Sequence, residues 1–333
     1  MSILVGDNLS LHELQKRINP DGTMAKITEL LERKKPIFED IPFVEANDVT
    51  SHVMTRRTSL PTGQHRKFNQ GIKPSKSTST QGSEPMAMIG DFSEVDKDLC
   101  DLHGNPKQKR LQEDAAFMEG IMQTVASTLF YGNHQLENEK IDGLATRYND
   151  LGAEQGANIV DAGGTGSDNA SIFLVGWGEG SCYGIYPKGH QSGLQHKDWG
   201  DVIAERDDGR LEVYRSQFKM SYGLAIEDWR NVARLANIDV SDLKLAGTSG
   251  YTGADLINDM IELISLPHGG VGNGASYCLY APKKVKTALD KIARAEQNGN
   301  LSYDTVDGKP MTTFQGIPIK EENSLVTTEA RVV

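Results

Sequence analysis

The sequence predicts an α+β fold. Segments with helical periodicity are interleaved with short glycine-punctuated segments typical of strands, but the regular βαβ order of a parallel sheet is missing. No internal repeat is visible, which argues against a solenoid or a propeller. The chain has 333 residues, enough for a substantial core, and about 150 residues per domain gives a prior of roughly two domains.

Charge and composition limit the classes of function. The chain carries 35 basic and 46 acidic residues, a net charge of -11, so its surface repels phosphate and a dedicated nucleic-acid-binding protein is not expected. We also expect no secretion signal and no membrane span. The three cysteines lie far apart without a CxxC pair, which predicts buried, reduced thiols in an intracellular chain: Cys100, Cys182 and Cys278.

The first 46 residues predict two short amphipathic helices. Ser10 and Glu13 form a capping-box pattern at the start of the first helix, and a Pro-Asp-Gly turn separates it from the second. Pro36 and Pro42 then interrupt the chain. The apolar positions that carry the helical spacing are Leu11, Leu14 and Ile18, followed by Met24, Ile27, Leu30 and Leu31.

Residues 47–90 predict a long two-stranded hairpin with little core of its own. Thr, Ser, Gly, Gln, Lys and Arg dominate the segment, and short alternating runs flank an LPTG turn at 60–63. Excursions longer than about 12–15 residues usually have a functional reason, so we expect this one to contact another molecule. Its cations match either an acidic copy of the same protein or phosphate, although Phe68 alone could stack on a base. These cations are Arg56, Arg57, Arg66, Lys67, Lys73 and Lys76.

One long helix is predicted from Pro106 to Tyr131. Asn105 and Pro106 are a typical N-cap and first helical residue, and Gly132-Asn133 marks the end. The spacing of apolar residues predicts a single buried stripe: Leu111, Ala115, Met118, Met122, Val125 and Leu129.

The rest of the chain predicts shorter elements. Strands are expected over 158–162, 171–177 and 181–186, and a pair of strands over 200–226 turning at Asp207-Asp208-Gly209. Helices are expected over 228–236, 255–263 and 282–295, with strands over 276–280 and 312–319.

Common catalytic motifs are incomplete. The glycine-rich runs at 163–166 and 247–250 lack the GK[ST] ending of a phosphate-binding loop, no G-x-S-x-G is present, and no histidine lies in HExxH. The remaining candidate for a metal or acid/base site is His190 with His196 and Asp198. We expect these residues to lie in surface loops, because a Gly-rich turn gives them no helix face on which to converge.

Several strings, taken as a set, resemble one family. The chain is similar over nearly its whole length to the major capsid proteins of tailed bacteriophages with the Hong Kong 97 type fold, most of all to those of epsilon-fifteen-like short-tailed phages. The strings are LPTG (60–63), NQG (69–71), PSKST (74–78), FYGN (130–133), GLATRY (143–148), AGGTGS (162–167), VGWG (175–178), YPKG (186–189), DWR (228–230) and AR (233–234).

The resemblance implies a division of the chain into the parts of that fold. The implied parts are an N-terminal arm (1–46), an extended loop (47–98), a mainly peripheral domain (99–227) with a spine helix (106–131) and long strands (200–226), a mainly axial domain (228–303), and a C-terminal strand returning to the sheet (304–333).

The resemblance also implies a function. Such proteins assemble as hexamers and pentamers into the icosahedral head of the virion, which encloses double-stranded DNA without sequence-specific binding. Implied partners are a scaffolding protein, a portal and, in some relatives, a cementing or staple protein, with assembly in the host bacterial cytoplasm. No catalytic residue, cofactor or metal is expected. The alternatives are an encapsulin-like nanocompartment shell and a soluble α+β hydrolase using His190, His196 and Asp198.

The extended loop of one subunit is then expected to lie over its neighbour. We predict that its cations meet acidic residues of the next subunit, with arginine favoured for its two-pronged contact with carboxylates. Some relatives cross-link Lys to Asn in this region, but nothing marks a reactive pair here. The predicted interface consists of Arg56, Arg57, Arg66, Lys67, Lys73 and Lys76 on one side and Glu94, Asp96 and Glu119 on the other.

Overall fold

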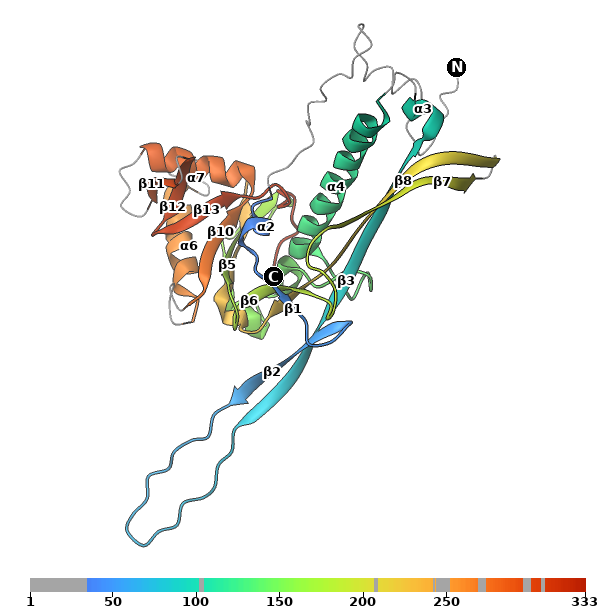
Figure 1. Cartoon of the computed structure of the whole chain (residues 1–333). Helices are drawn as coiled ribbons and strands as arrows, with labels where there is room; N and C mark the ends of the chain where they lie inside the picture. The colour runs from blue at the N-terminus through green and yellow to red at the C-terminus, as the bar shows by residue number, and fades with distance from the viewer. Residues whose placement is uncertain are drawn as a thin grey trace.

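The computed structural model describes residues 35–101, 105–206, 209–241, 243, 252–268, 274–295, 301–306 and 309–333. The two helices predicted within the first 34 residues lie outside this part of the chain. A 13-stranded mixed sheet organises the molecule, with α4 along one part of it and α6 and α7 against another (Figure 1). The predicted α+β class is therefore confirmed.

The helices and strands are as follows. Helices are α2 (Ile37–Asp40), α3 (Lys97–Asp101), α4 (Pro106–Tyr131), α5 (Leu144–Arg147), α6 (Gly253–Ser265) and α7 (Lys283–Ala295), with 3-10 turns at Glu154–Asn158 and Trp229–Asn231. Strands are β1 (Phe43–Glu45), β2 (Ser51–Ser59), β3 (Thr78–Asp96), β4 (Ile159–Asp161), β5 (Asn169–Trp177), β6 (Cys182–Tyr186), β7 (Gln195–Arg206), β8 (Gly209–Ile226), β9 (Val232–Asp239), β10 (Ser276–Ala281), β11 (Leu301–Val306), β12 (Lys309–Phe314) and β13 (Ile317–Glu321).

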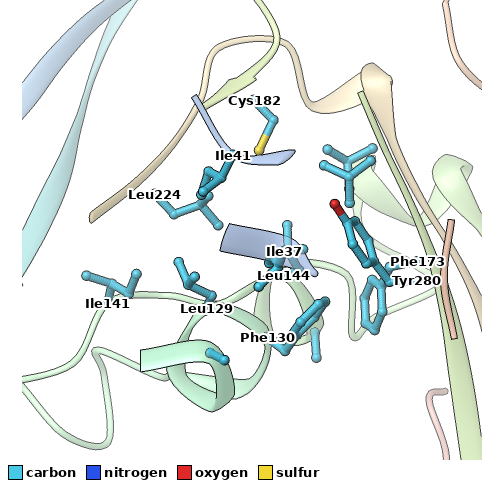
Figure 2. Packing of buried hydrophobic residues seen from close by; sticks show 14 of the residues in the cluster. Ile37, Ile41, Leu129, Phe130, Ile141, Leu144, Phe173, Cys182, Leu224 and Tyr280 are labelled. Atoms are coloured by element: carbon cyan, nitrogen blue, oxygen red, sulfur yellow. The ribbon is translucent and has the colours of Figure 1, made fainter. Parts of the chain in front are cut away.

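Two large hydrophobic cores hold the body together. The first lies between the C-terminal half of α4 and the sheet, where Leu129 and Phe130 pack with Ile37 and Tyr280 (Figure 2). The second lies under α6 and α7, around Leu256 and Leu289. The sheet separates and connects the two, because alternate residues of β5 enter different cores.

The predicted long helix is confirmed with both of its bounds. Gly132 follows the helix with an extended ψ of 146°, and a Cβ at this position would lie 2.3 Å from the carbonyl oxygen of Ile141, so the close approach requires glycine. The predicted stripe is right only in the C-terminal half, where Val125 and Leu129 are buried. In the N-terminal half Leu111 is 66% exposed and Ala115 is also exposed.

A polar contact replaces apolar packing under that N-terminal half. The side chain buried there is Asp114, which accepts a hydrogen bond of 3.1 Å from the Ser216 hydroxyl on β8. Lys109 is also buried and donates to the carbonyl oxygens of Leu99 and Cys100 at the end of α3. The apolar spacing therefore misidentified the buried face in this half.

The predicted hairpin is confirmed as an antiparallel pair of β2 with the first part of β3. Residues 60–77 between them have no regular secondary structure apart from a turn at Phe68–Asn69. β3 continues beyond the predicted end of the hairpin and pairs with β8 from Met86 to Asp96. The ribbon is thus an extension of the main sheet.

The other elements are mostly as predicted. The paired strands β7 and β8 are present, with β7 beginning five residues earlier than expected; residues 207–208 of their turn lie outside the described chain. Strands β4, β5, β6 and β10 and helices α6 and α7 match the predicted segments within a few residues.

Two of the predicted elements differ from those in the structure. The helix predicted over 228–236 is a 3-10 turn followed by β9, which is buried along nearly all its length between β4 and β5. A strand buried on both faces shows no alternation, so its apolar run cannot be told from a helix by period alone. The single strand predicted over 312–319 is two strands, because Gln315 and Gly316 both have positive φ and form a tight turn between β12 and β13.

The predicted burial of the thiols is confirmed. Cys100, Cys182 and Cys278 are all buried and free. None of the helices in the described part of the chain is long and apolar enough to cross a membrane.

Candidate interaction surface

The projecting loop, residues 60–77, is the feature that distinguishes this chain from a self-contained globular protein. It extends away from the body (Figure 1), and every one of its residues is exposed. Phe68 is fully exposed (102%), and Leu60 and Ile72 are 71% and 59% exposed. Large apolar side chains gathered on one exposed segment are typical of a surface that another molecule covers.

The projecting loop is also strongly basic. It contains Arg66, Lys67, Lys73 and Lys76 and no acidic residue, whereas the whole chain has a net charge of -11. These four side chains form no ion pair with the residues that the structure describes. Hydrogen bonds inside the loop are few and long, such as Lys67 N to Gln70 Oε1 at 3.3 Å and Lys73 N to Gln64 Oε1 at 3.4 Å.

The two arginines on β2 differ from each other. Arg57 points outward and is exposed. Arg56 instead turns toward its own body: its Nη2 lies 3.7 Å from Glu84 Oε1 and donates a hydrogen bond to the carbonyl oxygen of Ile226. Arg57 is therefore exposed like the loop cations, whereas Arg56 contacts the body at the base of the ribbon.

The predicted acidic partners lie outside the ribbon. Glu94 and Asp96 are in the last part of β3, which runs from the ribbon to α3 at the other end of the subunit (Figure 1), and Glu119 is in α4. Glu94 pairs with Arg215 at 2.6 Å and Glu119 with Lys35 at 2.6 Å. Asp96 accepts a hydrogen bond of 2.9 Å from the backbone N–H of Asp98. A single subunit thus keeps the two halves of the predicted interface apart, and their contact between subunits stays a prediction.

A second exposed surface was missed from the sequence. Ser216 on β8 contacts Asp114 on α4, so its side chain is on the face of the sheet that α4 covers. Ser93 on β3 lies opposite Ser216 and shares that face. Because neighbouring side chains on a strand alternate between faces, Phe92 is on the face away from α4. Met88 shares that face, as does Trp199, whose Nε1 donates to Gln217 Oε1 opposite Phe92. All three apolar side chains are exposed. The available signal was the spacing of Met88 and Phe92, which are four positions apart and therefore share one face of a strand.

The base of the ribbon holds a charged contact that sequence reasoning also missed. Arg147, on α5, donates to both carboxylate oxygens of Glu84 on β3, at 2.9 Å and 2.6 Å. Nearby, Tyr183 donates to Glu227 at 2.7 Å and contacts His52 at 3.1 Å. Burial and the bond to Glu227 raise the pKa of Tyr183, which keeps its hydroxyl protonated as a donor.

The histidine candidate does not form a site in the structure. His190 lies in a loop as predicted, but the prediction was wrong for His196 and Asp198, which are on β7. His196 is stacked on Phe218 with ring centroids 4.9 Å apart, and His190 is exposed, its Nδ1 3.3 Å from the carbonyl oxygen of Lys188. Asp198 instead pairs with Arg110 at 2.5 Å, and that bond, with one from the Gly200 N–H, lowers the pKa of Asp198. Among the described residues, no three His, Cys, Asp or Glu side chains are placed to hold a metal ion together.

Comparison with solved structures identifies the fold. A structure of bacteriophage Epsilon15 is similar with a TM-score of 0.76 and 26% identity, covering 100% of this chain and 99% of that one. The bacteriophage JBD30 capsid has a TM-score of 0.52 and 8% identity over 89% and 93% of the two chains. These likenesses confirm the Hong Kong 97 type fold that the sequence resemblance implied.

Sequence comparison gives the family. No curated protein sequence matches the chain. A family model described as "Major capsid protein GP7", however, matches residues 19–333, which is nearly the whole chain. The chain therefore belongs to the major capsid protein GP7 family.

Proposed function

We propose that this chain is the major coat protein of a tailed bacteriophage, and that its copies assemble as hexamers and pentamers into the icosahedral head that encloses double-stranded DNA. The family match and the likeness to the Epsilon15 structure over the whole chain support this function. The observation that carries it is the projecting loop, whose apolar and cationic side chains remain exposed in the isolated subunit.

The projecting loop provides each subunit with a surface that binds the next subunit. Contacts between two different surfaces of identical subunits close into rings when the rotation is right, and rings can then join into shells. We assign the loop as one of these surfaces and a neighbouring body as the other. The basic loop and the net charge of -11 on the whole chain make the two surfaces electrostatically complementary. Glu94, Asp96 and Glu119 are the proposed acidic contacts.

The parts of the fold follow from this function. We assign 1–46 as the N-terminal arm, 47–98 as the extended loop, 99–227 as mainly the peripheral domain, 228–303 as mainly the axial domain and 304–333 as the returning C-terminal strand. The exposed ribbon and the long α4, in the positions expected for the extended loop and the spine helix, support this division.

Further partners are part of the same proposal. A closed shell of controlled size calls for a scaffolding protein during assembly in the host cytoplasm and for a portal through which DNA enters. A cementing or staple protein is a further candidate for the exposed face around Met88, Phe92 and Trp199. The acidic chain fits a wall that encloses DNA without holding it tightly.

The match to a capsid family favours this function over a nanocompartment shell. The hydrolase alternative is disfavoured because His196 stacks on Phe218, Asp198 pairs with Arg110 and His190 is exposed.

Electron microscopy tests the proposal. The full chain is expressed alone and together with its genomic neighbours, and the purified material is examined by negative stain. The expected result is rings or closed shells tens of nanometres across, with closed shells favoured when a scaffolding protein is present. Uniform small particles that never assemble under either condition would contradict the proposal.

A further inference from the structure

We propose that Glu84, Arg147 and Arg56 form a pivot that fixes the direction in which the ribbon leaves the body. Arg56 then acts inside its own subunit as a positioning residue, in addition to any contact with a neighbour. The inference rests on the proposed function, because the direction of the ribbon matters only if the projecting loop must reach a defined place on another copy.

Glu84 occupies the point at which the ribbon joins the body. Up to Pro85, β3 pairs with β2, and from Met86 onward it pairs with β8. Any rotation of the ribbon relative to the sheet therefore takes place around these residues. A charged side chain that is only 8% exposed at such a junction needs a partner, since a buried carboxylate without one is costly.

Arg147 supplies that partner from the body. Its two terminal nitrogens contact the two oxygens of Glu84 at 2.9 Å and 2.6 Å, the fork-to-fork arrangement that fixes orientation as well as distance. Its Nε donates to the carbonyl oxygen of Asp142 at 3.0 Å, which holds the guanidinium in place. The contact therefore ties β3 in a defined orientation to the segment that follows α4.

Arg56 connects the second strand of the ribbon to the same carboxylate. It lies on β2, with Nη2 3.7 Å from Glu84 Oε1, and donates to the carbonyl oxygen of Ile226 at the end of β8. Glu84 thus lies between two guanidinium groups, one from each side of the junction. Its loss would leave two cations close together with no carboxylate between them, and their repulsion would push the ribbon away from the body.

Two further contacts join the ribbon to the body, and in one of them His52 on β2 lies 3.1 Å from the Tyr183 hydroxyl. Met54, which is 5% exposed, packs into a small cluster with Tyr183, Ile185 and Ala225 that is separate from the two large cores. Beside the ribbon lies a cleft of about 730 Å³, bounded by ribbon residues such as Arg57 and by body residues around Arg230. The charged group differs from these contacts because it ties both strands of the ribbon to the body, β3 through Glu84 and β2 through Arg56. We therefore assign it the role of fixing the direction of the ribbon.

The experiment measures the direction directly in unassembled full-length subunits. Spin labels are attached to Ser79→Cys on the exposed ribbon and Gln135→Cys on the exposed body, and the distance distribution between them is recorded. The native cysteines are buried, so labelling is confined to the introduced pair. We expect one narrow distribution in the otherwise unchanged chain and at least a twofold broadening in Glu84→Ala.

Matched variants separate positioning from folding. Arg57→Ala, one residue from Arg56 but exposed, should leave the distribution unchanged, whereas Arg56→Ala should broaden it while keeping the Glu84–Arg147 pair. The double variant Glu84→Leu/Arg147→Met removes both buried charges, so it should restore stability without restoring the narrow distribution. If Glu84→Ala fails to fold, Arg56→Ala and the double variant provide the result.

A folded Arg56→Ala chain and a folded double variant that both keep the narrow distribution would overturn the pivot. This outcome is independent of the proposed function, which the formation of shells by the unchanged chain tests. If the unchanged chain forms shells but the variants keep its narrow distance distribution, only the pivot is contradicted. If the unchanged chain never assembles, the proposed function is contradicted.

Discussion

The projecting loop differs from the buried ion pair of Arg234 with Glu329, which we call the joint, in whether its charges are paired within the subunit. In the joint, Arg234 Nη2 pairs with Glu329 Oε2 at 2.8 Å, and the two residues are 3% and 7% exposed. In the loop, the basic side chains are all exposed and form no ion pair with a described residue. Charges that are satisfied inside the chain hold the subunit together, and those left exposed are available to a neighbour.

The joint connects parts of the chain that are distant in sequence. Glu329 accepts a hydrogen bond of 2.5 Å from the Tyr131 hydroxyl at the end of α4, and Arg234 on β9 donates to the carbonyl oxygens of Ala145 and Tyr148. Burial, followed by the charge of Glu329, raises the pKa of Tyr131, so the hydroxyl remains a donor. The C-terminal segment thus fastens α4 to the sheet.

This contrast predicts that substitutions in the two regions have separable effects. The joint should control the stability of the subunit, and the loop should control assembly without changing that stability.

The largest effect on stability is expected for Glu329→Ala, which leaves Arg234 buried without its carboxylate. Removing one member of a buried ion pair costs about 3–5 kcal/mol in the free energy of unfolding. Urea denaturation of unassembled subunits would measure it. Arg331→Ala, exposed two residues away, is the control and should stay within about 0.5 kcal/mol of the unchanged chain. A cost below about 1 kcal/mol for Glu329→Ala would mean that the joint is not what fastens these elements.

The next effect concerns assembly. Replacing Leu60, Phe68 and Ile72 together by Ser should leave the unfolding midpoint unchanged, because all three side chains are exposed in the subunit. If a neighbour buries them, each loses about 1.5–3 kcal/mol of apolar burial, enough to raise the critical concentration for assembly more than about tenfold. Light scattering across a concentration series gives that value. Normal assembly of the triple variant would show that these side chains remain exposed in the shell.

A smaller effect is expected from charge reversal. The double variant Arg66→Glu/Lys67→Glu should assemble more slowly, because it loses the attraction between the basic loop and an acidic neighbour. Added salt should slow the unchanged chain more than the variant, because salt screens that attraction over a Debye length of about 8 Å at physiological ionic strength. Stopped-flow light scattering would measure both rates. Lys188→Glu, an exposed reversal on the body, is the matched control. Equal rates and equal salt dependence for the three chains would contradict the proposed attraction between the loop cations and acidic residues of a neighbour.

The smallest effect compares thiols in the two regions. Burial raises the pKa of Cys100 to about 11 and that of Cys278 to about 12, so at pH 8 both remain thiols and are poor nucleophiles. Because the shift is upward, reactivity should appear only as the pH approaches these values or the chain unfolds. A cysteine placed at Phe68 should react at pH 8 like a free thiol. Fast reaction of a native cysteine in the folded subunit would contradict its burial.

The sequence predicted those features that depend on local signals. Pro106 and Gly132 mark the ends of α4, and the composition of residues 60–77 identifies the loop and its cations. The pivot and the joint depend on contacts between distant residues: Glu84 and Arg147 are 63 positions apart, and Arg234 and Glu329 are 95 apart. The residues next to each of these four side chains in the sequence give no signal that identifies its partner. For the same reason Arg56 was grouped with the loop cations, although its guanidinium faces its own body.

The most direct test of the central claim, that a neighbouring subunit completes the projecting loop, is a cryo-electron microscopy reconstruction of assembled particles at side-chain resolution. We expect residues 60–77 of each subunit to lie on the body of another copy, with Phe68 buried there and the loop cations beside carboxylates of that copy. Density showing the loop extended into solvent, or folded back on its own subunit, in an otherwise closed shell would contradict it.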